Sequence, residues 1–144
     1  MILKLNILVF TAVAAAMDLK WWKVRNLWIL AGIAGGMLYQ FFSEESPGIA
    51  QGIIGMILPA VLLGFFWYSG LIGAGDVKLF SAVGLWIGGV LILEFMLFSL
   101  LSGAVYFFIL AAAGRPVNEL LKKRIHIAVC AFISALCLTG GIYG

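Results

Sequence analysis

Long apolar runs alternate with short polar stretches along the whole chain. The apolar runs cover residues 3–18, 27–42, 49–68, 76–87, 90–112 and 125–143. A helix that crosses a bilayer needs about 20 predominantly apolar residues, and the longest of these runs reach that length. The pattern therefore predicts an all-α, polytopic membrane protein with six transmembrane helices in a single domain, residues 1–144.

Glycine and asparagine mark the ends of several runs. The stretch Gly70–Gly75 is rich in glycine, which indicates a non-helical connection before the fourth run. No strong break follows between residues 77 and 113, and one helix of that length would overshoot the bilayer. We therefore expect a turn at Gly88 and Gly89, and we expect Asn26 to cap the second helix.

Composition excludes most other protein classes. The chain is 65% hydrophobic and 10% charged, whereas a soluble globular domain is about half apolar and about a quarter charged. The net charge of +3 indicates no nucleic-acid partner. Cys130 and Cys137 lie in one apolar run, about 10.5 Å apart along a helix axis, which is too far for a disulfide. Without a Cys-x-x-Cys pair they indicate no zinc site, and we interpret them as small packing residues.

The charged loops predict how the helices are oriented. The loop with Lys20, Lys23 and Arg25 is basic, as is the loop over residues 114–124, whereas the loop with Glu44 and its neighbour is acidic. Basic loops stay in the cytoplasm by the positive-inside rule. Six crossings with both termini outside place the basic loops on the cytoplasmic side and the acidic loop opposite.

Asp18 and Asp76 stand at the edges of apolar runs, where an ionisable side chain is costly and is by default a functional candidate. Two crossings separate them, so the chain returns to the same face and both acids lie at similar depth near the cytoplasmic surface. We therefore expect the two carboxylates to meet.

Two carboxylates in one site share a proton because both cannot ionise cheaply. One can accept a proton from water while the other protonates the carbonyl oxygen or the leaving amine, which requires no metal or cofactor. Gly73 and Gly75 precede Asp76, and they allow unwound backbone and close approach of a substrate. The pattern favours an aspartic peptidase.

The helix dipoles would divide the roles of the two acids. If Asp76 begins a helix, the dipole favours its charged form and it acts as the base. Asp18 would lie at the opposite dipole end and act as the acid, provided that the first helix stops there. This inference fails if that helix continues through Lys20 and Trp21.

Each acid also has a structural interpretation. Asp76 could only cap a helix, and Asp18 could only pair with Lys20 or Lys23. Each of these is the more common role for a single residue. The preceding glycines and the shared membrane face favour catalysis when the two acids are considered together.

Two motifs resemble one peptidase family. Gly73-Ala74-Gly75-Asp76-Val77-Lys78 resembles the GxGDxK motif of the type IV prepilin peptidases, a family of intramembrane aspartic peptidases. Asp18-Leu19-Lys20, followed by Val24 and Asn26, resembles the family's first motif with the same spacing. Arg25 departs from that motif, because the family usually has proline there.

The resemblance implies which residues form the site. Asp18 and Asp76 would be the catalytic pair. The supporting motif residues would be Gly73, Gly75, Lys78, Lys20 and Asn26. Two roles stay open for Lys78, which could tune the pair or contact a lipid phosphate.

The resemblance also implies a function. The protein would remove the leader of type IV pilin-like precursors at the cytoplasmic face of a prokaryotic inner membrane. The chain lacks the family's Cys-x-x-Cys domain, so it resembles the short branch of tight-adherence pilus systems, which does not N-methylate the product. The alternative is a non-enzymatic pilus-assembly scaffold or a small proton-coupled transporter.

Overall fold

Helix is the only regular structure in the part of the chain that the computed structural model describes, namely residues 2–21, 24–44, 46–70, 72–114 and 127–140. The helices are α1 (Ile2–Trp21), α2 (Asn26–Phe42), α3 (Ile49–Tyr68), α4 (Ala74–Ile87), α5 (Gly89–Ala112) and α7 (Ile127–Gly140). The predicted all-α fold class is confirmed for these ranges.

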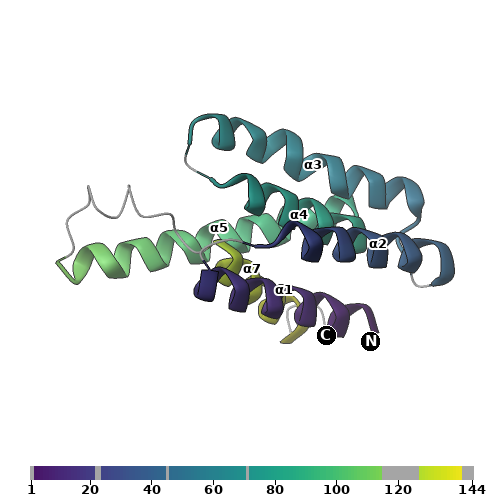
Figure 1. The fold of residues 1–144 in the computed structure, drawn as a ribbon, viewed down its shortest axis with the longest axis horizontal. Helices are drawn as coiled ribbons and strands as arrows, with labels where there is room; N and C mark the ends of the chain where they lie inside the picture. Colours follow the sequence, from purple (N-terminus) through teal and green to yellow (C-terminus); the bar gives the residue numbers. More distant parts are fainter. Residues whose placement is uncertain (1, 22–23, 45, 71, 115–126, 141–144) are drawn as a thin grey trace.

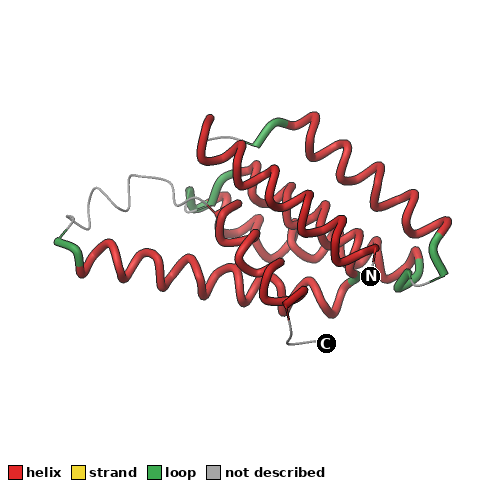
Figure 2. Tube along the Cα trace, turned by 90° about the horizontal axis from the view of Figure 1, so that it is seen from below, coloured by secondary structure: helices red, strands yellow, loops and turns green. Residues whose placement is uncertain are grey.

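The short helix α4 lies at the centre of the bundle. It contacts α1, α2, α3, α5 and α7, and its side chains from Leu79 onward are buried except for Ser81. Figure 1 shows α4 between α3 on one side and the pair α1 and α7 on the other. In both Figure 1 and Figure 2 the C-terminal half of α5 extends beyond the other described helices. The core therefore forms around α4.

Two glycines let α3 and α4 touch through their backbones. A Cβ atom added to Gly55 would collide with the carbonyl oxygen of Gly84, and one added to Gly84 would collide with the carbonyl oxygen of Gly55. Small residues at a helix crossing permit such close approach, and van der Waals packing then stabilises the pair. This contact fixes the position of α4 against α3.

Polar side chains attach α2 to the other side of α4. The Gln40 amide donates a buried 2.7 Å hydrogen bond to the Leu85 carbonyl oxygen, one of the last carbonyls of α4, which lack partners within the helix. The Trp86 indole donates a 2.8 Å bond to the Gly32 carbonyl oxygen, and its ring stacks on Tyr39 at 5.8 Å. Helix α3 is thus held to α4 by close backbone packing, and α2 is held by directional hydrogen bonds.

The predicted break between the fourth and fifth helices is confirmed. Gly88 ends α4 with φ of 85°, and α5 begins at Gly89. Such a φ favours glycine, which has no Cβ to clash. The α3 bounds also agree with the third predicted run, Ile49–Tyr68.

Three predicted boundaries are wrong. Helix α1 continues to Trp21, beyond its expected end at Asp18. Helix α4 begins at Ala74, so the expectation that the whole Gly70–Gly75 stretch is non-helical fails at its end. Asn26 does not cap α2, because Arg25 holds the cap position and Asn26 is already helical.

Two of the described helices, α3 and α5, are long and apolar enough to cross a membrane. Only 22% of the most apolar window of α3 and 17% of that of α5 is buried inside the bundle, so their apolar faces are left for an outer medium. Helix α2 and residues 128–137 are apolar but shorter. Six crossings therefore stay a prediction.

The glycine contact generates a stability prediction. Gly84→Ala should destabilise the protein by about 1–3 kcal/mol, because the added methyl group overpacks a backbone contact. Gly64→Ala in α3 is the matched control, since its Cβ meets no atom within 4 Å. Thermal unfolding in detergent measures both, and equal melting temperatures would contradict the backbone contact.

Candidate functional site

Asp18 and Asp76 lie on adjacent helices at one end of the bundle. Asp18 is in the last turn of α1 and is buried, with 9% of its surface exposed. Asp76 is in the first turn of α4 and is half-buried. Helices α1 and α4 contact each other, and Figure 1 shows the end of α1 and the start of α4 at the same end of the molecule.

Cys130 on α7 lies near the end of α1 that carries Asp18. It lines one small cavity together with Leu19, which follows Asp18 in α1, and Ser102 of α5. The thiol is free, as predicted, and it is buried. Helices α1, α5 and α7 therefore converge at the end of α1 that carries Asp18.

A small cavity adjoins this position. It has a volume of about 130 Å³ and is lined by Leu19, Ser102, Tyr106, Val129, Cys130 and Ile133. Its walls are almost entirely apolar, so it would accept an apolar group more readily than a charged one. Sequence reasoning missed Cys130 and Ser102, because only the packing of α7 against α1 and α5 brings them here.

Asp76 supports the start of its own helix but is not the N-cap residue. Gly73 holds the N-cap position and Asp76 is the third residue of α4, and the Gly73 backbone N–H donates a 3.3 Å hydrogen bond to the Asp76 Oδ2 atom. The same bond supports a base, because an N–H donor and the positive end of the helix dipole both stabilise a carboxylate. Support of the helix start and catalysis are therefore compatible at this position.

The dipole argument for Asp18 fails. Helix α1 continues through Lys20 and Trp21, so Asp18 is not at the end of the helix. The helix dipole therefore does not support Asp18 as the acid. The Lys20 ammonium lies 4.8 Å from the centroid of the Trp21 ring, a cation–π contact typical of an interface. Lys23, the other proposed partner of Asp18, lies outside the described residues.

The glycines before Asp76 are not unwound in the expected way. Gly73 has extended backbone with φ of −76°, and Gly75 is helical and does not have a positive φ. A Cβ added to Gly75 would meet no atom within 4 Å. Gly75 thus leaves open space beside Asp76, and its absence of a side chain is not explained by packing.

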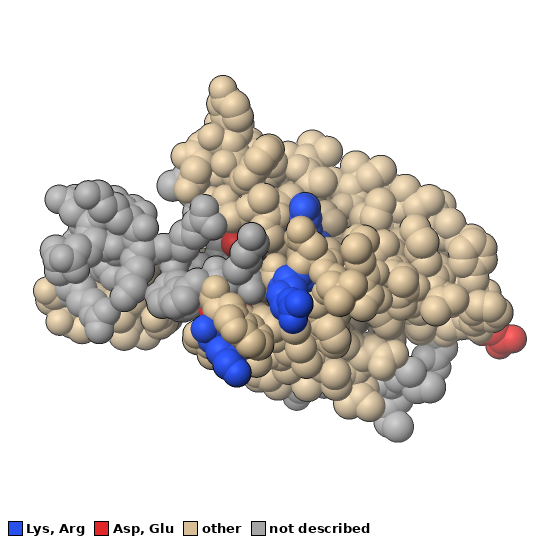
Figure 3. Space-filling view, viewed as in Figure 1, with Lys and Arg blue, Asp and Glu red and all other residues tan. Residues whose placement is uncertain are grey.

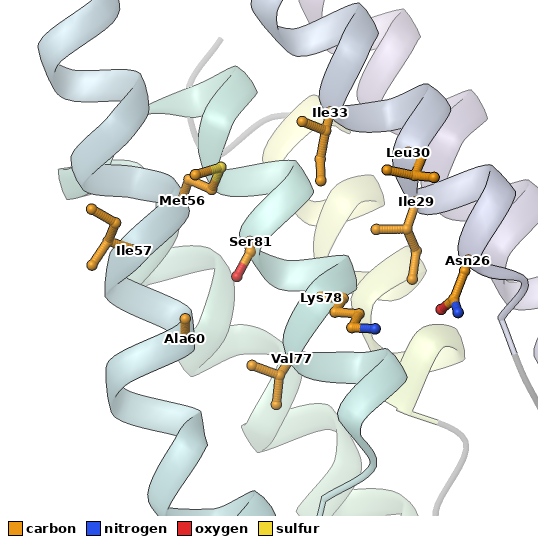
Figure 4. Close-up of a pocket in the computed structure, with 10 residues that line it drawn as sticks. All are labelled: Asn26, Ile29, Leu30, Ile33, Met56, Ile57, Ala60, Val77, Lys78 and Ser81. Atoms are coloured by element: carbon orange, nitrogen blue, oxygen red, sulfur yellow. The ribbon is translucent and has the colours of Figure 1, made fainter.

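Lys78 and Asn26 both lie at a second place, on a different face of α4 from Asp76. Both line a groove of about 420 Å³ between α2 and α3, with α4 as its floor. Two positions along a helix correspond to about 200° of rotation, so Lys78 and Asp76 use different faces of α4. In Figure 4 Lys78 points across the groove toward Asn26.

Basic side chains gather at the end of the molecule that carries the acids. Lys20, Arg25 and Lys78 are exposed, and Figure 3 shows basic groups over the ends of α1, α2 and α4. An acidic group lies at the opposite end, over the turn between α2 and α3. Residues 115–124 of the second basic loop lie outside the described residues. Among the described ones, no group of three or more metal-ligating side chains occurs.

The hydrogen bond at Asp76 can be tested by stability. Asp76→Ala should cost about 0.5–1.5 kcal/mol because the Gly73 N–H loses its acceptor. Asp76→Asn should cost less, since the amide oxygen still accepts a hydrogen bond. Thermal unfolding of the two variants decides the point, and an equal loss in both would argue against this bond.

Comparison with known proteins gives one match. Residues 5–108 match the family model described as the type IV leader peptidase family. This range contains both acids and every supporting motif residue predicted from the sequence. No curated protein and no solved structure shows a significant match.

Proposed function

Because this chain belongs to the type IV leader peptidase family, we propose that it is an aspartic endopeptidase in which Asp18 and Asp76 form the catalytic pair. One observation carries the assignment. The two acids, far apart in sequence, lie on contacting helices at the same end of the bundle, Asp18 in the last turn of α1 and Asp76 in the first turn of α4. Such convergence is what a two-carboxylate site requires.

The proposed reaction uses the two carboxyl groups in turn. Two close carboxylates share one proton, and the Gly73 N–H bond favours the charge on Asp76. Asp76 takes a proton from water as the water oxygen bonds to the scissile carbonyl carbon, while Asp18 gives its proton to the carbonyl oxygen. Asp76 then protonates the leaving amine, Asp18 recovers a proton from the diol, and the C–N bond breaks.

The proposed substrates are type IV pilin-like precursors, each a leader peptide joined to an apolar helix. The proposed location is the cytoplasmic membrane of a prokaryote, where this one domain crosses several times with its site near the cytoplasmic face. The apolar α3 and α5 support a membrane location. Exposed basic groups at the end that carries the acids support the orientation.

The catalytic pair gives the first functional prediction. Asp18→Asn and Asp76→Asn should each lower cleavage of a precursor by at least about a hundredfold, because each removes an acid–base group. The double variant should be no worse than either single one, because the residues act as a unit. Mass spectrometry of the precursor in proteoliposomes measures the cleavage.

Glu44→Gln provides the control for this test. It also removes one carboxylate, but from an exposed position outside the catalytic pair, and should retain full activity. Substantial cleavage by either Asp→Asn variant would refute the aspartic mechanism. A folded wild-type protein that removes no leader would instead favour the scaffold or the transporter.

The product should carry an unmodified amine. Two carboxyl groups and water suffice for hydrolysis, and none of the proposed site residues transfers a methyl group. The purified protein, incubated with precursor and a methyl donor, should yield a mature product without added mass. A gain of one methyl group would contradict this prediction.

A further inference from the structure

Helices α2 and α3 are held by α4 much more than by each other. Each packs extensively on α4, whereas their mutual contact is slight. The space between them is a groove of about 420 Å³, and Figure 4 shows side chains of all three helices around it. Its lining residues are Asn26, Ile29, Leu30, Ile33, Met56, Ile57, Ala60, Val77, Lys78 and Ser81.

The groove has an apolar length and a polar end. Asn26 and Lys78 line it near the start of α2 and of α4, the end of the bundle where the acids lie. Ser81 is the third polar lining residue, and no acidic residue lines it. Among the described residues no salt bridge involves Lys78, and an ammonium at an apolar surface gains from a carboxylate partner.

We propose that this groove binds the apolar helix of the precursor and that Lys78 pairs with an acidic side chain near the start of that helix. The proposal rests on the proposed function, because it names where the same substrate docks. Ala60 and Ser81 are small, so the backbone of a docked helix can approach closely. Because Lys78 is positively charged, it would favour a precursor that carries a negative charge at this position.

A route connects the groove with Asp76. Ala74, Lys78 and Ser81 are spaced as i, i+4 and i+7, so they follow one face of α4, and this face borders the groove. Gly75 lies between that face and Asp76, and the space where its side chain would be is empty. A chain leaving the groove in extended form can pass over Gly75 and reach the acids.

This route favours the precursor over a bound phospholipid. A lipid would fill the apolar groove and meet Lys78 through its phosphate, but it would need no passage to Asp76. A precursor needs both, because its helix and its scissile bond must bind at the same time. Lys78 and Asn26 then act as docking residues, and Gly75 provides clearance.

The test uses binding as well as cleavage. A fluorescent precursor is titrated into nanodiscs that hold the Asp18→Asn protein, so that the bound precursor is not consumed. Ala60→Trp in this background should raise the Kd about tenfold, because the indole fills the groove. Val61→Trp is the matched control, because Val61 is 67% exposed and does not line the groove.

A charge exchange tests the role of Lys78. Lys78→Glu should raise the Kd for a precursor with an acidic residue at the start of its helix by about tenfold. Replacing that residue by lysine should restore binding to Lys78→Glu. Lys78→Glu should leave the melting temperature near that of the parent protein, since Lys78 is exposed.

The possible outcomes separate the proposals. Equal Kd values for Ala60→Trp and Val61→Trp, or no rescue by charge exchange, would overturn the docking groove. If the Kd of the Lys78→Glu variant changed only with the fraction of anionic lipid in the nanodisc, the groove would be assigned to phospholipid. This result would also overturn the docking proposal. Groove-dependent binding without cleavage by the wild-type protein would defeat the proposed function but leave the docking site standing.

Discussion

The backbone contact between Gly55 and Gly84 fixes the central helix on which the rest of the structure depends. Neither glycine can accept a Cβ without collision, so α3 and α4 approach more closely than side chains would allow. In an apolar medium the hydrophobic effect contributes little between helices, and van der Waals contact and buried hydrogen bonds provide the stability. Gln40 and Trp86 supply such bonds between α2 and α4. The position of α4 then decides where its first turn, with Asp76, lies.

One helix therefore serves two surfaces. Asp76 lies in the first turn of α4, at the end of the bundle where the contacting helix α1 ends, whereas Lys78 lies at the groove between α2 and α3. Rotation by two residues separates the two faces, although the residues are neighbours in sequence. In our proposal this separation lets the substrate helix dock on one face of α4 while its cleavage site reaches the other. In this proposal the substrate passes from one face to the other by crossing only the first turn of α4.

Local errors in the sequence interpretation came from short-range contacts at the ends of helices. Helix α1 was expected to end at Asp18, but it continues to Trp21, and the last turn places the Lys20 ammonium over the Trp21 ring. Gly75 was expected to be unwound, yet α4 already begins at Ala74, where the hydrogen bond from the Gly73 N–H to Asp76 supports the first turn. Glycine tolerates both conformations, so its presence alone did not distinguish them. The break at Gly88 was predictable because a continuous helix would have been too long.

The sequence by itself determined the helical class, most of the helix bounds and the two acids as the functional candidates. Those features depend on local apolar runs, on glycine at a break and on the cost of a carboxylate at a membrane boundary. Only the tertiary structure decided that Cys130 and Ser102 line a cavity with Leu19 of α1 and that Lys78 and Asn26 line one groove. Both depend on which helices pack together and on their rotation about their axes. The apolar pattern around helices such as α3 and α5 does not specify that rotation, because their outward faces are as apolar as their buried ones.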